Sequence, residues 1–526
     1  MRTLHQTTLL LAFPAIAWLV TGCNQTEAPS EPQSPEATFD MGGSHTLWVN
    51  DDGIPTPTGS SCNNPNFKRI QDAVNAATPG DRINVCEGNY VEQVTIPAGK
   101  DNITLRSVKR WDAIIHAPPV MTTPKAIVRV NGAHNVTIVA FTITGPGGGP
   151  CDFLEYGVRV DMGGSADILG NHITEIRDTP FSGCQNGVGV QVGRLFDPMP
   201  PDLRPPDITV GTANIIGNVI DKYQKNGVTI DNAGSSAEIK HNRILGIGPT
   251  AVIAQNGAQV SRGATAEIEH NFIAYNIYSP RTVASAGVLL FQSGQVLTDH
   301  NDVIVNDVNI YMFDAASGTA TTHNMVRAAT FDGIALQQEM SSGNQVEYNM
   351  TEENAGPGIG MYDARNNSVE NNHVEDNQDS GILLDNAHGN TVGDNQVRDN
   401  GTPGGDVTDG IRAEATSDGN TIENNHLRDN VTHDCHDNSV MGNTWVGNHG
   451  ETAFPPGLCD KDPNDAAFAT TETFGWDPNY PWTEQFGIAL DYDWAAAYAT
   501  VDTESLLQLL PAIGLPTHRK AASPNP

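Results

Sequence analysis

The segment NHVEDNQDSGILLD occupies residues 372–385 and recurs, in varied form, along most of the chain. Each copy joins an asparagine, two residues before an apolar position, to a strand-like run that begins with glycine. Five of the nine intervals between successive asparagines are 23 to 25 residues, about the length of one coil of a parallel β-solenoid. The repeat therefore predicts a solenoid. Its asparagines are Asn171, Asn218, Asn242, Asn271, Asn301, Asn324, Asn349, Asn372, Asn395 and Asn425.

Two features resemble the right-handed parallel β-helices of the pectin-lyase-like superfamily. The asparagine column is similar to the asparagine ladder of that family, and residues 67–77 place apolar side chains at helical spacing before short β-rich runs. The resemblance implies an all-β, single-stranded right-handed parallel β-helix with an N-terminal capping helix. We expect a signal peptide at residues 1–22, a flexible tether at 23–45, the β-helix at 46–459 and an irregular C-terminal cap at 460–526.

The chain opens with Arg2, an apolar run over residues 9–20 and then Thr21-Gly22-Cys23, which resembles the lipobox of bacterial lipoproteins. The resemblance implies export, lipidation of Cys23 and anchoring to the membrane of the bacterial cell envelope. The residue after the cysteine is Asn24 and not an aspartate, which favours sorting of the lipoprotein to the outer membrane. The alternative, a membrane-spanning helix, needs about 20 apolar residues, and this run is shorter.

The balance of charge and the cysteines restrict the partners and the compartment. The chain has 62 acidic and 28 basic residues, a formal net charge of −34. This acidity excludes nucleic acid as a direct partner. Besides Cys23 there are six cysteines, enough for three disulfides. Two cysteines that are one coil apart lie within disulfide reach. The expected disulfides are Cys62–Cys86, Cys151–Cys184 and Cys435–Cys459. A zinc site is the alternative, but no Cys-x-x-Cys occurs.

The glycine-initiated strands carry a second pattern. If the first and third residues after glycine point inward, the second and fourth point outward. Long insertions concentrate at one turn beside these strands, and another bulge, rich in proline, spans residues 195–208. We expect the outward side chains to form one exposed row that binds an extended polysaccharide; the alternative is a merely hydrated sheet face. The predicted binding residues are Arg159, Asp161, Gln191, Asp231, Gln255, Phe291, Gln337 and Tyr362.

For catalysis the best pair is Asp385 with Glu414, one coil apart and therefore about 5 Å between backbones. Such carboxylates suit the acid and nucleophile of a retaining glycosidase, or they share a Ca²⁺ ion. In lyases of the superfamily, calcium neutralises a uronate and an arginine or lysine removes the proton, and the resemblance implies that role for Arg412. Asp409 is a lesser candidate.

A second cluster, His433-Asp434-Cys435-His436-Asp437, has metal-ligand chemistry, but a turn beside a disulfide is the interpretation we favour because alternate residues of an extended segment diverge. The Gly-His-Gly and Arg-Ile-Lys motifs of polygalacturonases and the Asp-Pro-His motif of alginate epimerases are missing. The resulting hypothesis is an extracytoplasmic, lipid-anchored β-helix that binds a polysaccharide and cleaves it by lyase or hydrolase chemistry. The rival hypothesis is a non-catalytic surface spacer or adhesin.

Overall fold

The computed structural model describes residues 44–149, 151, 153–198, 204–280, 282–337 and 342–461. The expected signal peptide and lipidated Cys23 lie outside these ranges, as do most of the tether and nearly all of the expected C-terminal cap. Those expectations therefore remain predictions. The described residues all belong to the unit that begins at Ser44.

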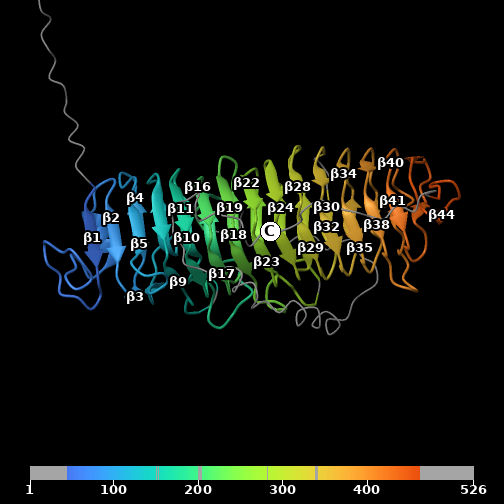
Figure 1. Cartoon of the computed structure of the whole chain (residues 1–526). Coiled ribbons are helices and arrows are strands. Elements are labelled where there is room, and N and C mark those ends of the chain that lie inside the picture. Colours follow the sequence, from blue (N-terminus) through green and yellow to red (C-terminus); the bar gives the residue numbers. More distant parts are fainter. Residues whose placement is uncertain are drawn as a thin grey trace, which may run out of the picture. The chain divides into compact units, whose positions relative to one another are not determined.

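Each full coil contributes one strand to each of three parallel sheets, and successive coils follow one another in sequence order (Figure 1). The first sheet has 15 strands in the described residues. These are β1 Thr46–Val49, β2 Arg82–Val85, β5 Thr104–Ser107, β8 Val136–Val139, β11 Ser165–Leu169, β16 Thr212–Ile216, β19 Ser236–Lys240, β22 Thr265–Glu269, β25 Val296–Asp299, β28 Ala320–Thr322, β31 Gln345–Glu347, β34 Ser368–Glu370, β37 Thr391–Gly393, β40 Thr421–Glu423 and β43 Thr444–Val446.

The second sheet contains the glycine-initiated strands of the repeat. Its described strands are β4 Val94–Pro97, β7 Ala126–Asn131, β10 Tyr156–Asp161, β13 Val188–Val192, β18 Asn226–Asp231, β21 Asn256–Ser261, β24 Ala286–Phe291, β27 Val308–Phe313, β30 Ile334–Gln337, β33 Ile359–Tyr362, β36 Ile382–Asp385, β39 Ile411–Ala413, β42 Cys435–Asp437 and β44 Ala453–Phe454.

The third sheet contains the strands that follow the repeated asparagines. Its described strands are β3 Gly88–Val91, β6 Ala113–His116, β9 Thr142–Thr144, β12 His172–Thr174, β17 Val219–Asp221, β20 Arg243–Leu245, β23 Phe272–Ala274, β26 Asp302–Ile304, β29 Met325–Arg327, β32 Met350–Glu352, β35 His373–Glu375, β38 Gln396–Arg398 and β41 His426–Arg428. The expected bulge is an antiparallel hairpin of β14 Arg194–Phe196 and β15 Asp207–Thr209.

Neighbouring strands of each sheet are joined by a whole coil, and parallel crossovers of this kind are right-handed. The prediction of a right-handed parallel β-helix is confirmed. The predicted alternation of inward and outward side chains also holds in these strands. The predicted inward residues Val158, Val160, Ile382 and Leu384 are fully buried. The inward Ile, Val and Leu side chains of all three sheets form one continuous apolar core.

The predicted asparagine ladder lies at the turn from the first sheet to the third. The Asn301 side-chain N–H donates to Asn324 Oδ1 at 2.9 Å and to the carbonyl oxygen of Ile268 at 2.8 Å. Two further ladders occupy the other two turns. One includes Asn354, Asn377, Asn400 and Asn430, and the other Asn344, Asn367, Asn390, Asn420 and Asn443. Stacked amides thus satisfy the buried backbone at every turn of these coils.

The N-terminal end is closed by α1 Ile70–Ala76, as predicted from its apolar spacing. Ile70, Ala73 and Val74 are buried against the first coil. Glu92 accepts hydrogen bonds from the first two helical N–H groups, of Ile70 at 2.9 Å and Gln71 at 3.0 Å. A carboxylate at this position satisfies N–H groups that no helical carbonyl reaches.

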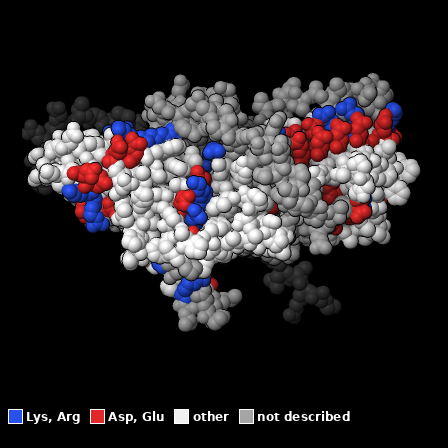
Figure 2. Space-filling view, turned by 90° about the horizontal axis from the view of Figure 1, so that it is seen from below, with Lys and Arg blue, Asp and Glu red and all other residues white. Residues whose placement is uncertain are grey.

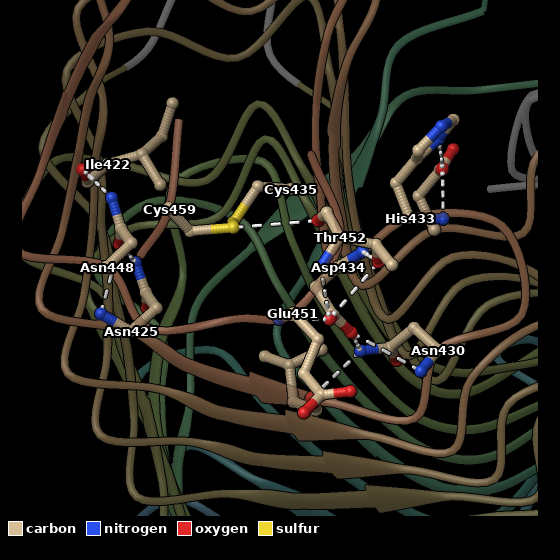
Figure 3. Close-up of a disulfide and its surroundings, with 12 residues drawn as sticks. Ile422, Asn425, Asn430, His433, Asp434, Cys435, Asn448, Glu451, Thr452 and Cys459 are labelled. Atoms are coloured by element: carbon tan, nitrogen blue, oxygen red, sulfur yellow. Dashed lines mark hydrogen bonds and ion pairs between the residues drawn. A yellow bond between two sulfur atoms is a disulfide. The ribbon is translucent and has the colours of Figure 1, made fainter. Parts of the chain in front are cut away.

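The three expected disulfides are present, with Cα separations of 5.6 Å for Cys62–Cys86, 5.1 Å for Cys151–Cys184 and 6.2 Å for Cys435–Cys459. Figure 3 shows the last of these beside Asp434. Asp434 Oδ1 accepts from the Asn430 side-chain amide at 2.9 Å, and Oδ2 accepts from the Glu451 N–H at 2.8 Å. Asp434 therefore takes the place of an asparagine at the end of its ladder.

Candidate functional site

The predicted binding row lies on the outer face of the second sheet, with two corrections of register. Asp231, Phe291, Gln337 and Tyr362 belong to one continuous column of strand partners, which also contains Ser261, Phe313 and Asp385. Gln191 does not belong to it, because Gln191 pairs with Arg159. Gln255 precedes β21 and Ser261 holds its expected place. In these coils Gly189 and Gly257 hold the register position of the strand glycine, as Gly157 and Gly227 do in the neighbouring coils.

The expectation that this row is exposed is wrong for most of its members. Arg159, Asp161, Gln191, Asp231, Gln255, Gln337 and Tyr362 are buried. In the N-terminal half, the cause is the β14–β15 hairpin together with neighbouring arginines. Arg159 donates to Asp207 of β15 at 2.7 and 2.8 Å and to Asp161 at 2.7 Å, and the Leu195 N–H donates to Asp231 at 2.8 Å. These charges stabilise one another instead of facing solvent.

The two glutamines have local structural partners. The Gln255 side-chain N–H donates to the carbonyl oxygen of Tyr223 at 2.6 Å, and its Oε1 accepts from the Ile247 N–H at 2.8 Å. The Gln191 side chain donates to the carbonyl oxygen of Gly193 at 2.6 Å. Gln191 therefore braces the backbone of its own coil, and Gln255 ties its coil to the preceding one.

The middle of the same face is apolar. Tyr311 and Tyr362 are buried with Leu289, and half-buried Phe291 and Phe313 stack at 5.4 Å between ring centroids. The two phenylalanines thus cover each other's ring faces. Beside Tyr362, burial raises the pKa of Asp332 to about 8, although the hydrogen bond with Tyr362 opposes the shift. Asp332 is therefore a neutral carboxylic acid at pH 7.

At its C-terminal end the face carries a charged cluster. Asp409 lies 3.0 Å from Nδ1 of His433 and of His436, and Arg412 Nη1 donates to it at 2.9 Å. Burial alone raises the pKa of Asp409, but the hydrogen bonds from His436 and Arg412 outweigh burial and lower it. The expectation that the His433 and His436 side chains diverge is wrong, since both converge on this carboxylate.

Arg412 holds Glu414 as well as Asp409. Its Nε donates to Glu414 Oε1 at 2.7 Å. Burial alone lowers the pKa of Arg412, but Glu414 and Asp409 outweigh burial and raise it. Arg412 therefore retains its proton. Asp385, one coil earlier, is half-buried on the same face.

A hollow of about 560 Å³ on the outer face of the first sheet was missed from the sequence. It crosses β16, β19, β22, β25 and β28 and is open to solvent, and a smaller one of about 260 Å³ lies over β31, β34 and β37. The sequence signal was a column of short polar side chains at Thr212, Ser236 and Thr265, which occupy one outward register position. Polar residues line the larger hollow, among them Thr212, Asn214, Ser236, Glu238, Thr265, Glu267 and Gln295.

The acids of this hollow are fixed by one lysine. Lys240 Nζ lies 3.2 Å from Glu238, 3.1 Å from Glu267 and 3.1 Å from Glu269. One cation thus faces three carboxylates from two neighbouring coils, and the wall of the hollow carries a net negative charge.

Acidic side chains also gather on the third sheet toward the C-terminal coils, and Figure 2 shows a row of them at that end of the face. Burial, reinforced by Glu353, Glu375 and Asp376, raises the pKa of Glu352, while Arg327 opposes the shift. Such a surface repels polyanions.

Among the described residues, no helix has the length and apolar character to cross a membrane.

Residues 250–454 match the family model described as periplasmic copper-binding protein (NosD). The match begins just before β21 and ends within β44, so it includes the charged cluster but less than half of the chain. No curated relative matches the sequence.

Solved structures with similar folds have low sequence identity. XylC in complex with xylose is 11% identical, with 76% of this chain and 86% of that chain covered and a TM-score of 0.44. A DFA-IIIase from Arthrobacter chlorophenolicus is 15% identical, with coverages of 69% and 85% and a TM-score of 0.41. A periplasmic alginate epimerase, AlgG, is 14% identical, with coverages of 73% and 83% and a TM-score of 0.36.

Proposed function

We propose that this chain is an extracytoplasmic β-helix protein that binds an extended, neutral polysaccharide in the hollow on the outer face of the first sheet. The observation that carries the proposal is the direction of the hollow, which follows the stacking of five consecutive coils. Four steps of about 4.8 Å give it a length of about 19 Å. An elongated, open site of this kind suits a polymer better than a compact ligand.

The lining favours sugar hydroxyls as partners. Hydroxyl groups of Thr212, Ser236 and Thr265 occupy one register column, and Asn214, Glu238 and Glu267 occupy the next column but one. Hydroxyls, amides and carboxylates together donate and accept hydrogen bonds, as a chain of sugar hydroxyls requires. Because the wall carries excess negative charge, a uronate polymer is repelled and a neutral one is preferred.

An oxidising, extracytoplasmic location fits the three disulfides, which are rare in reducing compartments. Within this proposal Cys23 carries the lipid that anchors the chain to the bacterial outer membrane or cell surface. Replacing Cys23 with alanine is expected to release the protein into the soluble fraction. Retention of the Cys23→Ala variant in washed membranes would contradict the lipid anchor.

Binding is tested by filling the hollow. In Asn214→Trp, a large side chain projects over β16, and affinity for a neutral polysaccharide is expected to fall by about tenfold or more, measured by isothermal titration calorimetry. Thr137→Trp is the matched control, because Thr137 holds the same register column two coils earlier and outside the hollow. Equal affinities of the two variants would contradict binding in this hollow.

A second candidate function, cleavage, is favoured by the charged cluster at the end of the second sheet. Asp385 and Glu414 lie on adjacent coils, and the bond from Arg412 orients Glu414. In this proposal they act on a bound polysaccharide as paired carboxylates or through a shared Ca²⁺, with Arg412 as the positioning residue. The test is release of reducing ends with and without Ca²⁺, abolished in Asp385→Asn and Glu414→Gln. Activity that survives both substitutions would contradict this site, and a chain that neither binds nor cleaves would be a spacer or adhesin.

A further inference from the structure

A column of four histidines lies at one corner of consecutive coils, where the first sheet turns into the third. The ring centroids of His241 and His270 are 5.1 Å apart, those of His270 and His300 are 5.2 Å apart, and those of His300 and His323 are 4.7 Å apart. Tyr348 continues the column at 5.2 Å from His323. Each ring precedes a ladder asparagine, so the stacking of the coils sets the spacing.

The backbone at this corner has an unusual conformation, which limits the residue types that fit there. The four histidines have φ between 51° and 55°, in the left-handed region. Histidine, asparagine and glycine all suit this conformation, and other coils have Gly170, Gly217, Asn371 or Asn424 at the same corner. The conformation therefore permits four successive imidazoles but does not require them.

Asp299, the last residue of β25, joins two of these rings. Its Oδ2 lies 2.7 Å from His300 Nδ1, and its Oδ1 lies 3.2 Å from His323 Nδ1. The Thr322 hydroxyl donates to Oδ1 at 2.6 Å. The potential ligand atoms of Asp299, His300 and His323 all lie within 4.8 Å of one another. Two coils thus supply two imidazoles and one carboxylate at a single point.

The group is also accessible. The side chains of Asp299, His300 and His323 are 22%, 28% and 29% exposed, so an ion can enter from solvent. Glu269 interacts electrostatically with His300, and Glu347 with His323. Together with the formal net charge of −34, these acids favour a cation at the corner.

We propose that Asp299, His300 and His323 bind one divalent transition-metal ion, of the class of Zn²⁺ or Cu²⁺. Imidazole and carboxylate ligands suit these ions, whereas Ca²⁺ prefers oxygen alone. In a tetrahedral zinc site, bonds of about 2.0–2.1 Å place ligand atoms about 3.3 Å apart. The contacts of 2.7 and 3.2 Å come close to that spacing, so small side-chain rotations suffice.

Metal binding requires Nδ1 of each imidazole to be free of its proton. In the metal-free chain Nδ1 of each ring lies within hydrogen-bond distance of Asp299. In the loaded chain the proton resides on Nε2, and the Nδ1 lone pair binds the ion. The carboxylate gives up the two hydrogen bonds and becomes the third ligand, and water completes the coordination.

The cluster of Asp409 with His433 and His436 has the same donor types, but its surroundings oppose a cation. Arg412 is 2.9 Å from Asp409 and stays charged, so it already provides the positive partner. Within the described residues, Asp299 instead contacts His300, Thr322 and His323, none of which carries a permanent positive charge. This difference assigns the metal to the histidine column.

The test is Zn²⁺ binding to the full mature chain, measured by equilibrium dialysis and calorimetry. His300→Asn and His323→Asn are suitable variants, because asparagine already occupies this corner at Asn371 and Asn424 and the fold is expected to tolerate it. Each is expected to weaken one Zn²⁺ site by at least about tenfold. Asp299→Asn is expected to do the same.

His388→Ala is the matched control, since His388 forms a similar ion pair with Asp418 at 2.7 Å, and that pair lies outside the histidine column. It is expected to leave the Zn²⁺ affinity unchanged. Electron paramagnetic resonance of the Cu²⁺-loaded chain is expected to report two bound nitrogens in the wild type and one in His323→Asn. The proposal would be overturned by an unchanged Zn²⁺ affinity in both His300→Asn and His323→Asn, or by no Zn²⁺ binding in the wild type. Loss of Zn²⁺ binding only in His433→Ala would also overturn it.

Discussion

The neutral carboxylic acid of Asp332 predicts an unusual dependence of stability on pH. The pKa of this group is about 8 in the folded chain against an ordinary value of 3.8. Between those values the folded chain binds a proton that the unfolded chain has released. Stability contributed by the group is therefore complete below about pH 4 and is lost as pH rises to about 8.

The size of the effect follows from that interval. Slightly more than four pH units, at about 1.4 kcal/mol each, correspond to a loss of about 5–6 kcal/mol by pH 8. Asp332→Asn carries no charge at any pH and avoids this loss. The new amide N–H lacks an assured partner in the buried site, which costs about 1–3 kcal/mol. The variant is thus expected to be more stable than the wild type at pH 8 by about 2–4 kcal/mol.

The assay is differential scanning calorimetry of both proteins from pH 5 to pH 8.5. The Tm of the wild type is expected to fall relative to that of Asp332→Asn as the pH rises across this range. Asp112→Asn is the control, because Asp112 is exposed beside Lys109. Parallel curves for the wild type and Asp332→Asn would refute an Asp332 that is neutral at pH 7.

Three further predictions concern the framework. Asn301→Ala removes buried hydrogen bonds to Ile268 and Asn324 and is expected to cost about 2–4 kcal/mol of stability in chemical unfolding, whereas Asn75→Ala, at an exposed position of α1, changes it little. Arg159→Ala leaves buried Asp161 with Arg129 alone and is expected to cost about 1.5–3 kcal/mol, with an equal Tm contradicting the ion pair. Cys62→Ser combined with Cys86→Ser opens a loop of 24 residues and is expected to cost about 3 kcal/mol, and an unchanged Tm in this double variant would contradict a stabilising disulfide there.

The sequence predicted those features that depend on one coil at a time. The asparagine at Asn301 and its counterparts, the inward valines at Val158 and Val160, and cysteines one coil apart all repeat with the period of the fold. The register of Gln191 was missed because Gly187 and Gly189 both lie close to the strand, and periodicity alone cannot choose between two such glycines. The register of Gln255 was missed because 15 residues separate Asn242 from Gly257, against nine between Asn218 and Gly227.

The features that were missed depend on contacts between distant segments. Burial of Asp161 requires Arg129 from one coil and the hairpin that pairs with Arg159 from another. The hollow over β16 to β28 depends on the sizes of side chains in five coils. The meeting of His433 with Asp409 spans 24 residues. The His-Asn pairs were visible in the sequence, but only the stacking of the coils brings two of them onto Asp299.

The proposed function depends on whether the polar hollow of the first sheet binds an extended neutral polysaccharide. The decisive measurement is a binding screen of the full mature chain against matched neutral and uronate polysaccharides, with Asn214→Trp and Thr137→Trp alongside. We predict binding of a neutral polymer that is weakened in Asn214→Trp and unchanged in Thr137→Trp. No binding across the panel, or a preference for uronate polymers, would contradict this function and favour a spacer or adhesin.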